Sequence, residues 1–480
     1  MQNAVSGSYQ VSNNTKDVHF NYKYIWLISM VAAMGGFLFG YDWVVVGGAK
    51  PFYEPYFGLT TSAQQGWGTS SALIGCILGA FLCFWKSDAW GRKRLLILAG
   101  FLFIVSSVGT GLANTFFIYN AWRILGGVAI AMALNLAPMY ISEMAPSHLR
   151  GKLVSLNQLL IMIGVLAAQL TNWQISLLDP QISINASAEM VSQRWNIQYG
   201  WRWMFGVTAI PAFLFFVMMI FLPESVRWLV KNGQLNKAKD ILIKMGGTAY
   251  AQIELNAIQD TISQEEVAQV NYRDLFEPKL FKILMLGIFV ALLQQWCGMN
   301  VVFYYAADIF QAAGYNMQEM MLNIVVIGSV MVVSVIVTML VVEKTGRKKL
   351  MLLGTASMAV VYGLTGYFFL KGITGLPIVL LTLSNVAIYS LTLAPVVWVI
   401  LSEIFPNRIR GAAMSVAAIA LWIGNFSLTF SFPAIKENLG WTNNFWLYGV
   451  ICAIGFVILY FKLPETKGKT LEQIESALTD

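Results

Sequence analysis

The stretch SEMAPSHLRG, residues 142–151, returns as SEIFPNRIRG at residues 402–411. The two copies share Ser, Glu, Pro, Arg and Gly at the same offsets without a gap. Two more pairs keep the same order along the chain: DAWGRKR (88–94) with EKTGRKK (343–349), and PES (223–225) with PET (464–466). Three ordered matches predict a chain built from two related halves.

The composition places these repeats in a membrane protein. The 480 residues are 57% hydrophobic and only 11% charged, whereas soluble domains are typically about 25% charged. Mean hydropathy is +0.64, and the 14% of aromatic residues suit belts at two lipid–water interfaces. The formal net charge is +7. Because the Lys and Arg residues are concentrated on one side of the membrane, we interpret this charge as a signal of topology and predict no nucleic-acid partner.

Twelve apolar runs are long enough to cross the hydrocarbon core of a bilayer, which takes roughly 20 residues of helix. Because only a helix satisfies the backbone of such runs internally, we predict an all-α integral membrane protein. The predicted spans are 24–46, 67–87, 95–114, 118–141, 153–173, 203–222, 281–307, 322–342, 350–370, 377–401, 411–431 and 444–463.

A polar insertion divides the spans into two sets of six. Residues 223–280 are rich in Lys, Glu, Gln and Asn, and the segments 237–245 and 265–270 are typical of short helices. We predict an N-terminal six-helix bundle with its N-terminal tail over residues 1–222, and a linker over 223–280. A C-terminal six-helix bundle with a short tail follows over 281–480. The architecture is typical of transporters whose substrate binds between the halves near the midplane.

The distribution of basic residues predicts the orientation. With the N-terminus inside, the outer loops hold only four of the 31 Lys and Arg residues, namely Lys50, Arg194, Lys371 and Lys436. This positive-inside bias predicts cytoplasmic termini and a cytoplasmic linker in a multi-pass protein of the cell membrane (inner or plasma). The polar residues before Ile25 do not form a signal peptide.

Two ionisable residues stand inside spans. Asp42 interrupts the glycine-rich run FLFGYDWVVVGG, residues 37–48, and Arg123 stands among apolar residues in FFIYNAWRILGGV. Charges within spans are costly, face the bundle interior and tend to pair. We therefore predict an ion pair between Asp42 and Arg123. Such a pair can take part in transport, or it can be a static structural ion pair, which is the alternative interpretation.

Span seven carries amides and a phenol within an apolar helix. Gln294, Asn300 and Tyr304 fall on one face at helical spacing, and a helix break at Gly298 would re-aim Gln295. Amides donate and accept hydrogen bonds without charge, which suits a hydroxyl-rich ligand. Hydrogen bonding between helices is the alternative explanation.

The repeated motifs between spans combine acids with bases beside helix ends. Arg and Glu of the two halves can pair when the cytoplasmic side closes and part when it opens. The alternative is that these residues only set topology. The predicted gate network consists of Asp88, Gly91, Arg92, Glu143, Arg150, Glu224, Arg227, Glu343, Gly346, Arg347, Glu403, Arg410 and Glu465.

Seven motifs in order resemble the sugar porter family of the major facilitator superfamily, over residues 22–475. They are GRKR (91–94), PMYISEMAPSHLRGKL (138–153), PESVRWL (223–229), QQWCGMNVVFYY (294–305), EKTGRKK (343–349), SEIFPNRIRG (402–411) and PETKGKTLE (464–472). Within the family, the chain is most similar to bacterial xylose–proton symporters and facilitative glucose transporters. The resemblance implies the major facilitator fold, alternating access and no cofactor.

The resemblance also implies roles for individual residues. Asp42 matches the aspartate of proton-coupled relatives, which implies proton symport with Arg123 as its partner. Matching positions contact sugar in the family, which implies substrate binding by Gln158, Gln294, Gln295, Asn300, Trp398, Trp422 and Asn425. Tyr304 joins these predicted substrate-binding residues because it shares the helix face of Gln294 and Asn300. Met331 and Leu421 depart from the family, where polar residues are frequent, and imply a less polar pocket.

We predict a monosaccharide–proton symporter for a pentose such as xylose or for a hexose, working as a monomer in the lipid bilayer. A facilitative sugar or polyol uniporter and a sugar sensor that does not transport are the alternatives. An enzyme has little support, because His19 and His148 lie outside the deep parts of the spans. The four cysteines, Cys76, Cys83, Cys297 and Cys452, lie in apolar runs without metal-type spacing, so we predict no metal site.

Overall fold

The computed structural model describes residues 19–179, 193–267, 275–406, 409–467 and 473. All regular secondary structure in these ranges is helical. Eleven helical stretches within them are long and apolar enough to cross a membrane. The last stretch, α18 (Arg410–Lys462), is two helices joined at Gly440, whose φ of 69° interrupts the helix. The predicted all-α membrane fold with twelve crossings is confirmed.

The first six crossings come from residues before 222. They are α1 (Tyr22–Phe57), α2 (Ser62–Trp90), α3 (Arg92–Gly111), α4 (Phe116–Met144), α5 (Ser147–Ser176), and a sixth assembled from η2 (Asn196–Gly200), α7 (Trp201–Gly206) and α8 (Ala209–Phe221). Several of these helices extend beyond the predicted apolar run, because the flanking polar turns also remain helical.

The second six crossings are divided into more pieces. They are α11 (Pro278–Trp296) with α12 (Met299–Tyr304) and α13 (Ala306–Ala312), then α14 (Met317–Thr345), α15 (Arg347–Leu370), α16 (Leu376–Leu391) with α17 (Leu393–Ile404), and the two parts of α18. The outer loop expected between 431 and 444 is largely helical, because no residue in it stops the helix before Gly440.

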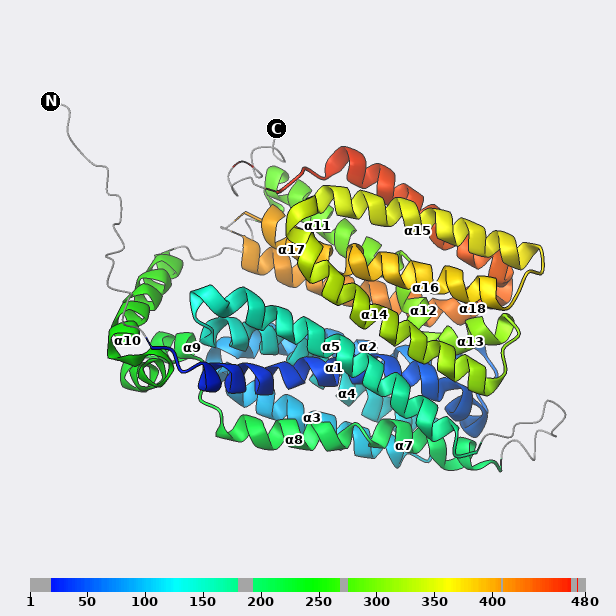
Figure 1. The fold of residues 1–480 in the computed structure, drawn as a ribbon, viewed down its shortest axis with the longest axis horizontal. Helices are drawn as coiled ribbons and strands as arrows, with labels where there is room; N and C mark the ends of the chain where they lie inside the picture. Colours follow the sequence, from blue (N-terminus) through cyan, green and yellow to red (C-terminus); the bar gives the residue numbers. More distant parts are fainter. Residues whose placement is uncertain (1–18, 180–192, 268–274, 407–408, 468–472, 474–480) are drawn as a thin grey trace.

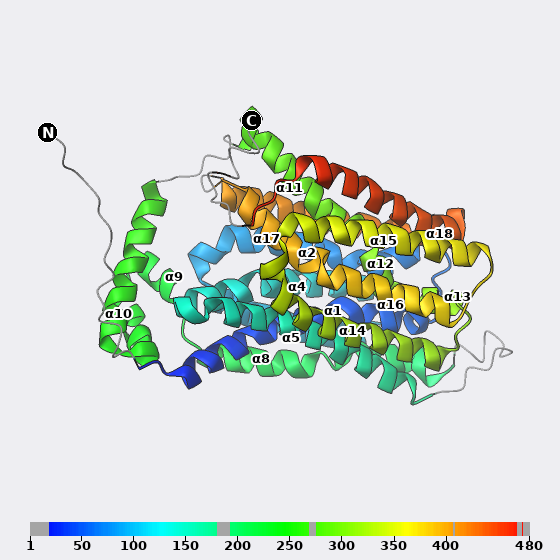
Figure 2. The same ribbon diagram turned by 45° about the horizontal axis from the view of Figure 1, so that its top comes forward.

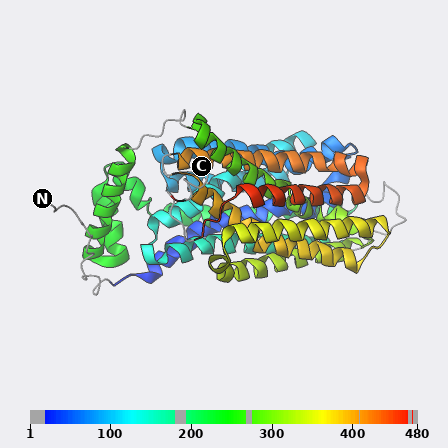
Figure 3. The same cartoon turned by 90° about the horizontal axis from the view of Figure 1, so that it is seen from above.

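The helices that form the crossings run along the long axis of the molecule (Figures 1 and 3). Figure 1 shows α1, α3, α7 and α8 on one side and α14 to α18 on the other. The described chain begins and ends toward the same end of the bundle, the end at which α9 (Val226–Lys231) and α10 (Leu235–Val267) lie. We call this the linker end and the opposite one the far end.

The main contacts between the halves are made by four helix pairs. Helix α2 packs on α18, α5 packs on α14, and α1 packs on α12 and α13 (Figure 2). Within the first half, α1 packs on α5 and α2 on α4, and within the second half α15 and α11 pack on α18. The domain boundaries at residues 222 and 280 stay a prediction.

Close packing of α1 on α5 fixes the position of Asp42. A Cβ atom added to Gly40 would lie 1.9 Å from the carbonyl oxygen of Ile161. The backbones of α1 and α5 are therefore in direct contact here, and there is no space for a side chain at position 40. A Cβ on Gly36 would lie 2.6 Å from Oδ1 of Asn157. The small residues at these two positions let the helices approach closely.

Two helix breaks shape the second half. Gly298 has a φ of 83° and separates α11 from α12, the break anticipated from the sequence. Thr392 separates α16 from α17. Pro395 follows three residues later, and its missing N–H removes the hydrogen bond that would continue the helix across this point.

Candidate functional site: a central cavity beside a buried ion pair

A cavity of about 280 Å³ lies between the two halves. Helices α1, α4 and α5 line it from the first half, and α11, α12, α14, α16, α17 and α18 line it from the second. Seven residues predicted to bind substrate line this cavity: Gln158, Gln294, Gln295, Asn300, Trp398, Trp422 and Asn425. The volume and the mixed lining suit a small polar molecule.

The break at Gly298 brings three amides of span seven to the cavity. Gln294 donates from Nε2 to the carbonyl oxygens of Leu393, at 3.4 Å, and Ala394, at 3.2 Å. Gln295 donates to Oε1 of Gln294 at 3.4 Å, and Asn300 donates to Oε1 of Gln295. The amides thus form a chain that ties α11 to the start of α17. A ligand that displaces these weak bonds would gain several donors and acceptors.

The α14 side of the cavity is apolar. Met331, Val335 and Met339 line it from α14, and Leu421 lines it from α18. Thr338 contributes a hydroxyl, but its one hydrogen is already engaged, since the carbonyl oxygens of Ser334 and Ser390 lie 2.9 Å and 3.2 Å away. Met331 and Leu421, for which the resemblance implied a less polar pocket, therefore lie in the cavity wall.

The predicted ion pair between spans one and four is present. Arg123 donates from a guanidinium nitrogen to Oδ1 of Asp42 at 2.6 Å, and both side chains are buried. The Arg123 guanidinium also lies over the Phe205 ring, 5.0 Å from its centroid. Asp42 Oδ2 is buried and accepts no hydrogen bond from the described residues. The contact between the two side chains is thus made through one oxygen of the carboxylate.

Tyr304 does not line the central cavity. It lines a second cavity of about 10 Å³ together with Asp42 and Arg123. This small cavity shares Phe39, Trp43 and Trp422 with the central one. Aromatic side chains therefore separate the ion pair from the central cavity, and Tyr304 stands on the ion-pair side of them.

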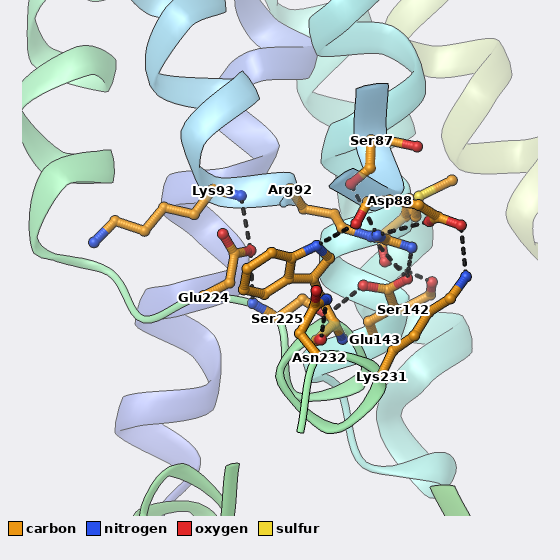
Figure 4. Close-up of polar contacts among 12 residues, drawn as sticks. Ser87, Asp88, Arg92, Lys93, Ser142, Glu143, Glu224, Ser225, Lys231 and Asn232 are labelled. Carbon is orange, nitrogen blue, oxygen red and sulfur yellow. Dashed lines mark hydrogen bonds and ion pairs between the residues drawn. The ribbon is translucent and has the colours of Figure 1, made fainter. Parts of the chain in front are cut away.

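At the linker end, the repeated motifs of the first half form a polar network (Figure 4). Arg92 binds Glu143 at 2.9 Å and Asp88 at 3.0 Å, and Lys231 binds the other oxygen of Asp88 at 2.7 Å. Glu224 accepts from the backbone N–H of Lys93 at 2.9 Å. The network ties α2, α3, α4 and α9 together.

Gly91 makes this arrangement possible. Its φ of 89° is in the left-handed region, and an added Cβ would lie 2.3 Å from Oε2 of Glu224. Glycine adopts such a conformation without steric cost. The Gly-Arg step of the motif is therefore explained by the backbone turn between α2 and α3.

The second half repeats the network with its own copies of the motifs. Arg347 binds Glu403 at 3.2 Å, and Glu465 accepts from the backbone N–H of Arg347 at 3.0 Å. Gly346, with a φ of 93°, stands beside Glu465 as Gly91 stands beside Glu224. Burial acts to raise the pKa of Glu465, but the backbone N–H groups around it outweigh burial and hold that pKa below the usual value.

The motif residues also make ion pairs inside each half: Arg92 with Asp88 and Glu143, Lys231 with Asp88, and Arg347 with Glu403. Pairing across the halves was expected only for a closed cytoplasmic side, so these contacts leave that expectation a prediction. The motifs tighten the helix ends within each half, since each acid reaches a base on the next helix of its own bundle. Arg410 likewise donates within its half, to the carbonyl oxygen of Phe405 at 3.2 Å.

Three more predicted gate residues complete the set. Arg150 lies near Glu254 of α10 and counteracts the effect of burial, which raises the pKa of that carboxyl. Arg227 belongs to α9, the first helix of the linker. The side chain of Glu343 lies outside the described part of the structure. The gating role of all thirteen residues stays a prediction.

The sequence analysis did not single out several residues of the cavity wall. Phe39 and Trp43 flank Asp42 on α1, and Tyr389 and Ser390 precede the break at Thr392. The sequence could have indicated Phe39 and Trp43 by their position near the intramembrane charge of Asp42, and Tyr389 and Ser390 by their position before a helix break. Ser155, one turn before Gln158 on α5, also lines the cavity.

Twelve crossings in two related halves, with a cavity between them and a charged pair beside it, define a secondary transporter of the membrane. The family model described as Sugar (and other) transporter matches residues 28–478, and the chain belongs to this family. Its fold is that of the major facilitator superfamily.

Two curated relatives and one solved structure illustrate the similarity. The chain is 38% identical over 471 residues to the glucose transport protein of Synechocystis sp., covering 95% of this chain and 97% of that protein. It is 33% identical over 491 residues to the D-xylose-proton symporter of Escherichia coli (strain K12), covering 96% and 97%. The inward-open structure of the xylose transporter XylE from E. coli matches with a TM-score of 0.81 at 32% identity, covering 94% of this chain and 99% of that one.

Proposed function

We propose that the protein is a secondary active transporter that carries a monosaccharide together with a proton by alternating access. The observation that carries the proposal is the buried Asp42–Arg123 pair, which lines a small cavity that shares Phe39, Trp43 and Trp422 with the central one. Relatives described as a xylose–proton and an arabinose–proton symporter support coupling to a proton.

The proton binds at Asp42 in this proposal. Burial favours the neutral form of a carboxylate, whereas an arginine in contact favours the charged form. Protonation at Oδ2 would neutralise Asp42 and weaken its bond to Arg123. Because α1 carries Asp42, Phe39 and Trp43, a loosened pair frees the helix that lines both cavities. Proton and sugar binding then favour each other by linkage.

The substrate class follows from the cavity. Its amides can donate to and accept from hydroxyls, and Trp398 and Trp422 offer faces for the C–H side of a sugar ring. The apolar α14 wall reduces the number of hydroxyls that the site can satisfy. A pentose such as xylose, or a hexose, is the substrate that we propose.

Orientation and state also belong to the proposal. The excess of Lys and Arg at the linker end supports cytoplasmic termini in the cell membrane. Contacts between the halves include the α1–α13 contact at the far end, and the match to an inward-open transporter supports an inward-facing state. We propose a monomer as the working unit, because each chain contains both halves of the cavity.

Sugar uptake into proteoliposomes, with and without a pH gradient and across a panel of monosaccharides and polyols, tests the proposal. We expect accumulation only with an inward proton gradient. Asp42→Asn should abolish accumulation but keep sugar exchange. Uptake that ignores the gradient would identify a uniporter, and sugar binding without uptake would identify a sensor.

A further inference from the structure

Four charged side chains form a cluster between the two halves at the far end. Lys50 of α1 lies 2.7 Å from Oδ2 of Asp308 on α13 and 3.2 Å from Oε2 of Glu54 on α1. Lys436 of α18 lies 3.1 Å from Oδ1 of the same Asp308. We call these four residues the far-end cluster. Its two cations and two anions cancel, and its Lys50–Asp308 bond joins the halves.

The far-end cluster is buried enough to matter energetically. The Lys50 side chain is 5% exposed, and those of Glu54 and Asp308 are each 14% exposed. Exposed ion pairs contribute little, but removing one partner of a buried pair leaves an uncompensated charge at high cost. The Asp308 carboxylate faces two cations, Lys50 and Lys436, so its charge is compensated from both halves.

The backbone around Lys50 positions it for this contact. A Cβ on Gly47, one turn earlier on α1, would lie 2.4 Å from the carbonyl oxygen of Phe303, so α1 and α12 touch here. The Lys50 ammonium also lies 5.2 Å from the centroid of the Tyr305 ring. Beside the cluster, Ser62 of α2 donates to Glu437 of α18, a second polar contact between the halves.

The arrangement of partners has a consequence for opening. Separating the halves breaks the Lys50–Asp308 bond, but Lys50 keeps Glu54 on its own helix, and Asp308 keeps Lys436 in its own half. Each half would retain one cation and one anion in contact. The bond between the halves can therefore break without leaving an isolated charge on either side.

We propose that the far-end cluster is a reversible latch of transport, in which the Lys50–Asp308 bond holds the far end closed while Glu54 and Lys436 receive the separated charges when it opens. This inference rests on the alternating access of the proposed function but on neither the sugar nor the proton. Lys50 and Asp308 are positioning residues, since they lie outside both cavities.

The latch predicts effects of opposite sign within one cluster. Lys50→Met and Asp308→Asn remove the bond between the halves, so the far end should open more often. Glu54→Gln removes the competitor for Lys50 within α1, so the Lys50–Asp308 bond should strengthen and the far end should open less often. A role in folding alone would not give opposite signs.

Distances between spin labels on the two halves test the latch. Labels replace Ala63 of α2 and Gln318 of α14, both exposed at the far end, in a variant whose four native cysteines are serine. Pulsed electron paramagnetic resonance in lipid nanodiscs, without sugar or pH gradient, gives the ratio of open to closed molecules. We expect roughly a tenfold or larger rise of this ratio for Lys50→Met and Asp308→Asn, and a fall for Glu54→Gln.

Arg194→Ala is the matched control. Arg194 binds Asp179 at 3.0 Å within the first half, so its loss should leave the distances unchanged. The latch is overturned if both Lys50→Met and Asp308→Asn give the distances of the Arg194→Ala control, or if Glu54→Gln shifts them in the same direction as Lys50→Met. If Lys50→Met does not fold, Asp308→Asn and Glu54→Gln decide the sign. The distance measurement involves no transport. A negative result here would therefore overturn the latch without affecting the proposal of proton coupling, and uptake that ignores the pH gradient would overturn proton coupling without affecting the latch.

Discussion

Arg123 holds one oxygen of Asp42 at 2.6 Å while the other oxygen has no hydrogen-bond partner among the described residues. Both side chains are buried, so the loss of either partner would leave the other charge uncompensated. In the proposed mechanism, the oxygen of Asp42 that Arg123 does not hold is where the proton binds.

The pair should show strong coupling in stability. Arg123→Met leaves the Asp42 carboxylate buried and uncompensated, so we expect a loss of about 3–5 kcal/mol in the free energy of unfolding. Asp42→Asn in the same chain removes the charge, so the double variant should regain most of that loss. Unfolding in detergent, followed for the wild type, both single variants and the double variant, measures the coupling.

Additive losses in that cycle would mean that the two residues do not act as a pair. Accumulation of sugar by the Asp42→Asn protein would separately remove Asp42 from proton coupling. Asp179→Asn, which breaks an ion pair in the same half but away from both cavities, is the control for a general loss of charge.

Met331 should restrict how many hydroxyls of the sugar are bound. Met331→Asn places an amide in the α14 wall of the cavity. A new hydrogen bond contributes roughly 0.5–1.5 kcal/mol, so the apparent affinity for a hydroxyl-rich hexose should rise about two- to tenfold. Binding measured by calorimetry across a set of deoxy-sugars shows which hydroxyl is involved.

Leu421→Asn, on the α18 side, gives an independent test of the same wall. Equal affinity of both variants and the wild type for every sugar would show that the apolar wall does not contact the substrate. Weaker binding of all sugars would indicate instead that the amide stays unpaired in the cavity.

The fold was predictable because each of its rules is local. Apolar runs fix the spans, and Asp42 and Arg123 could be matched because a lone charge in a span requires a partner. The break at Gly298 was likewise visible in the sequence. The helical segment before Gly440 was not, since polar residues outside the bilayer form helix or loop equally well.

The parts that escaped prediction depend on which half a side chain reaches. The spacing of the repeated motifs is the same whether Arg92 binds Glu143 of its own half or an acid of the other half. Tyr304 shares a helix face with Asn300, but the chain breaks at Tyr305 and the aromatic wall divides the two cavities. The far-end cluster joins residues from three helices, and sequence distance gives no indication of that.

Glu465 should stabilise the second half in a pH-dependent way. Its pKa in the folded protein is lowered by backbone N–H groups, among them those of Arg347 and Thr466. A lowered pKa gives stability that is present above the ordinary glutamate value of 4.5 and is lost as the pH falls through the folded value. Glu465→Gln should therefore lower the melting temperature by a few degrees at pH 7 and by less as the pH falls below 4.5.

Thermal unfolding of the purified protein between pH 7 and pH 4 checks this prediction. Asp260→Asn, at an exposed position of α10, is the matched control and should leave the difference near zero at every pH. A deficit of Glu465→Gln that is constant with pH would mean that the charge of Glu465 does not contribute.

Gly298 should be required for the geometry of the sugar site. Its φ of 83° is strained for any other residue, and an added Cβ would lie 2.6 Å from the Tyr448 ring. Gly298→Ala should destabilise the protein by about 1–2 kcal/mol or more from backbone strain alone. It should also weaken sugar binding, because the break aims Gln295 and Asn300 into the cavity. Gly363→Ala on α15 is the matched control, since a Cβ there meets no atom within 4 Å. Unchanged sugar affinity in a folded Gly298→Ala protein would show that the amides of α11 and α12 do not hold the substrate.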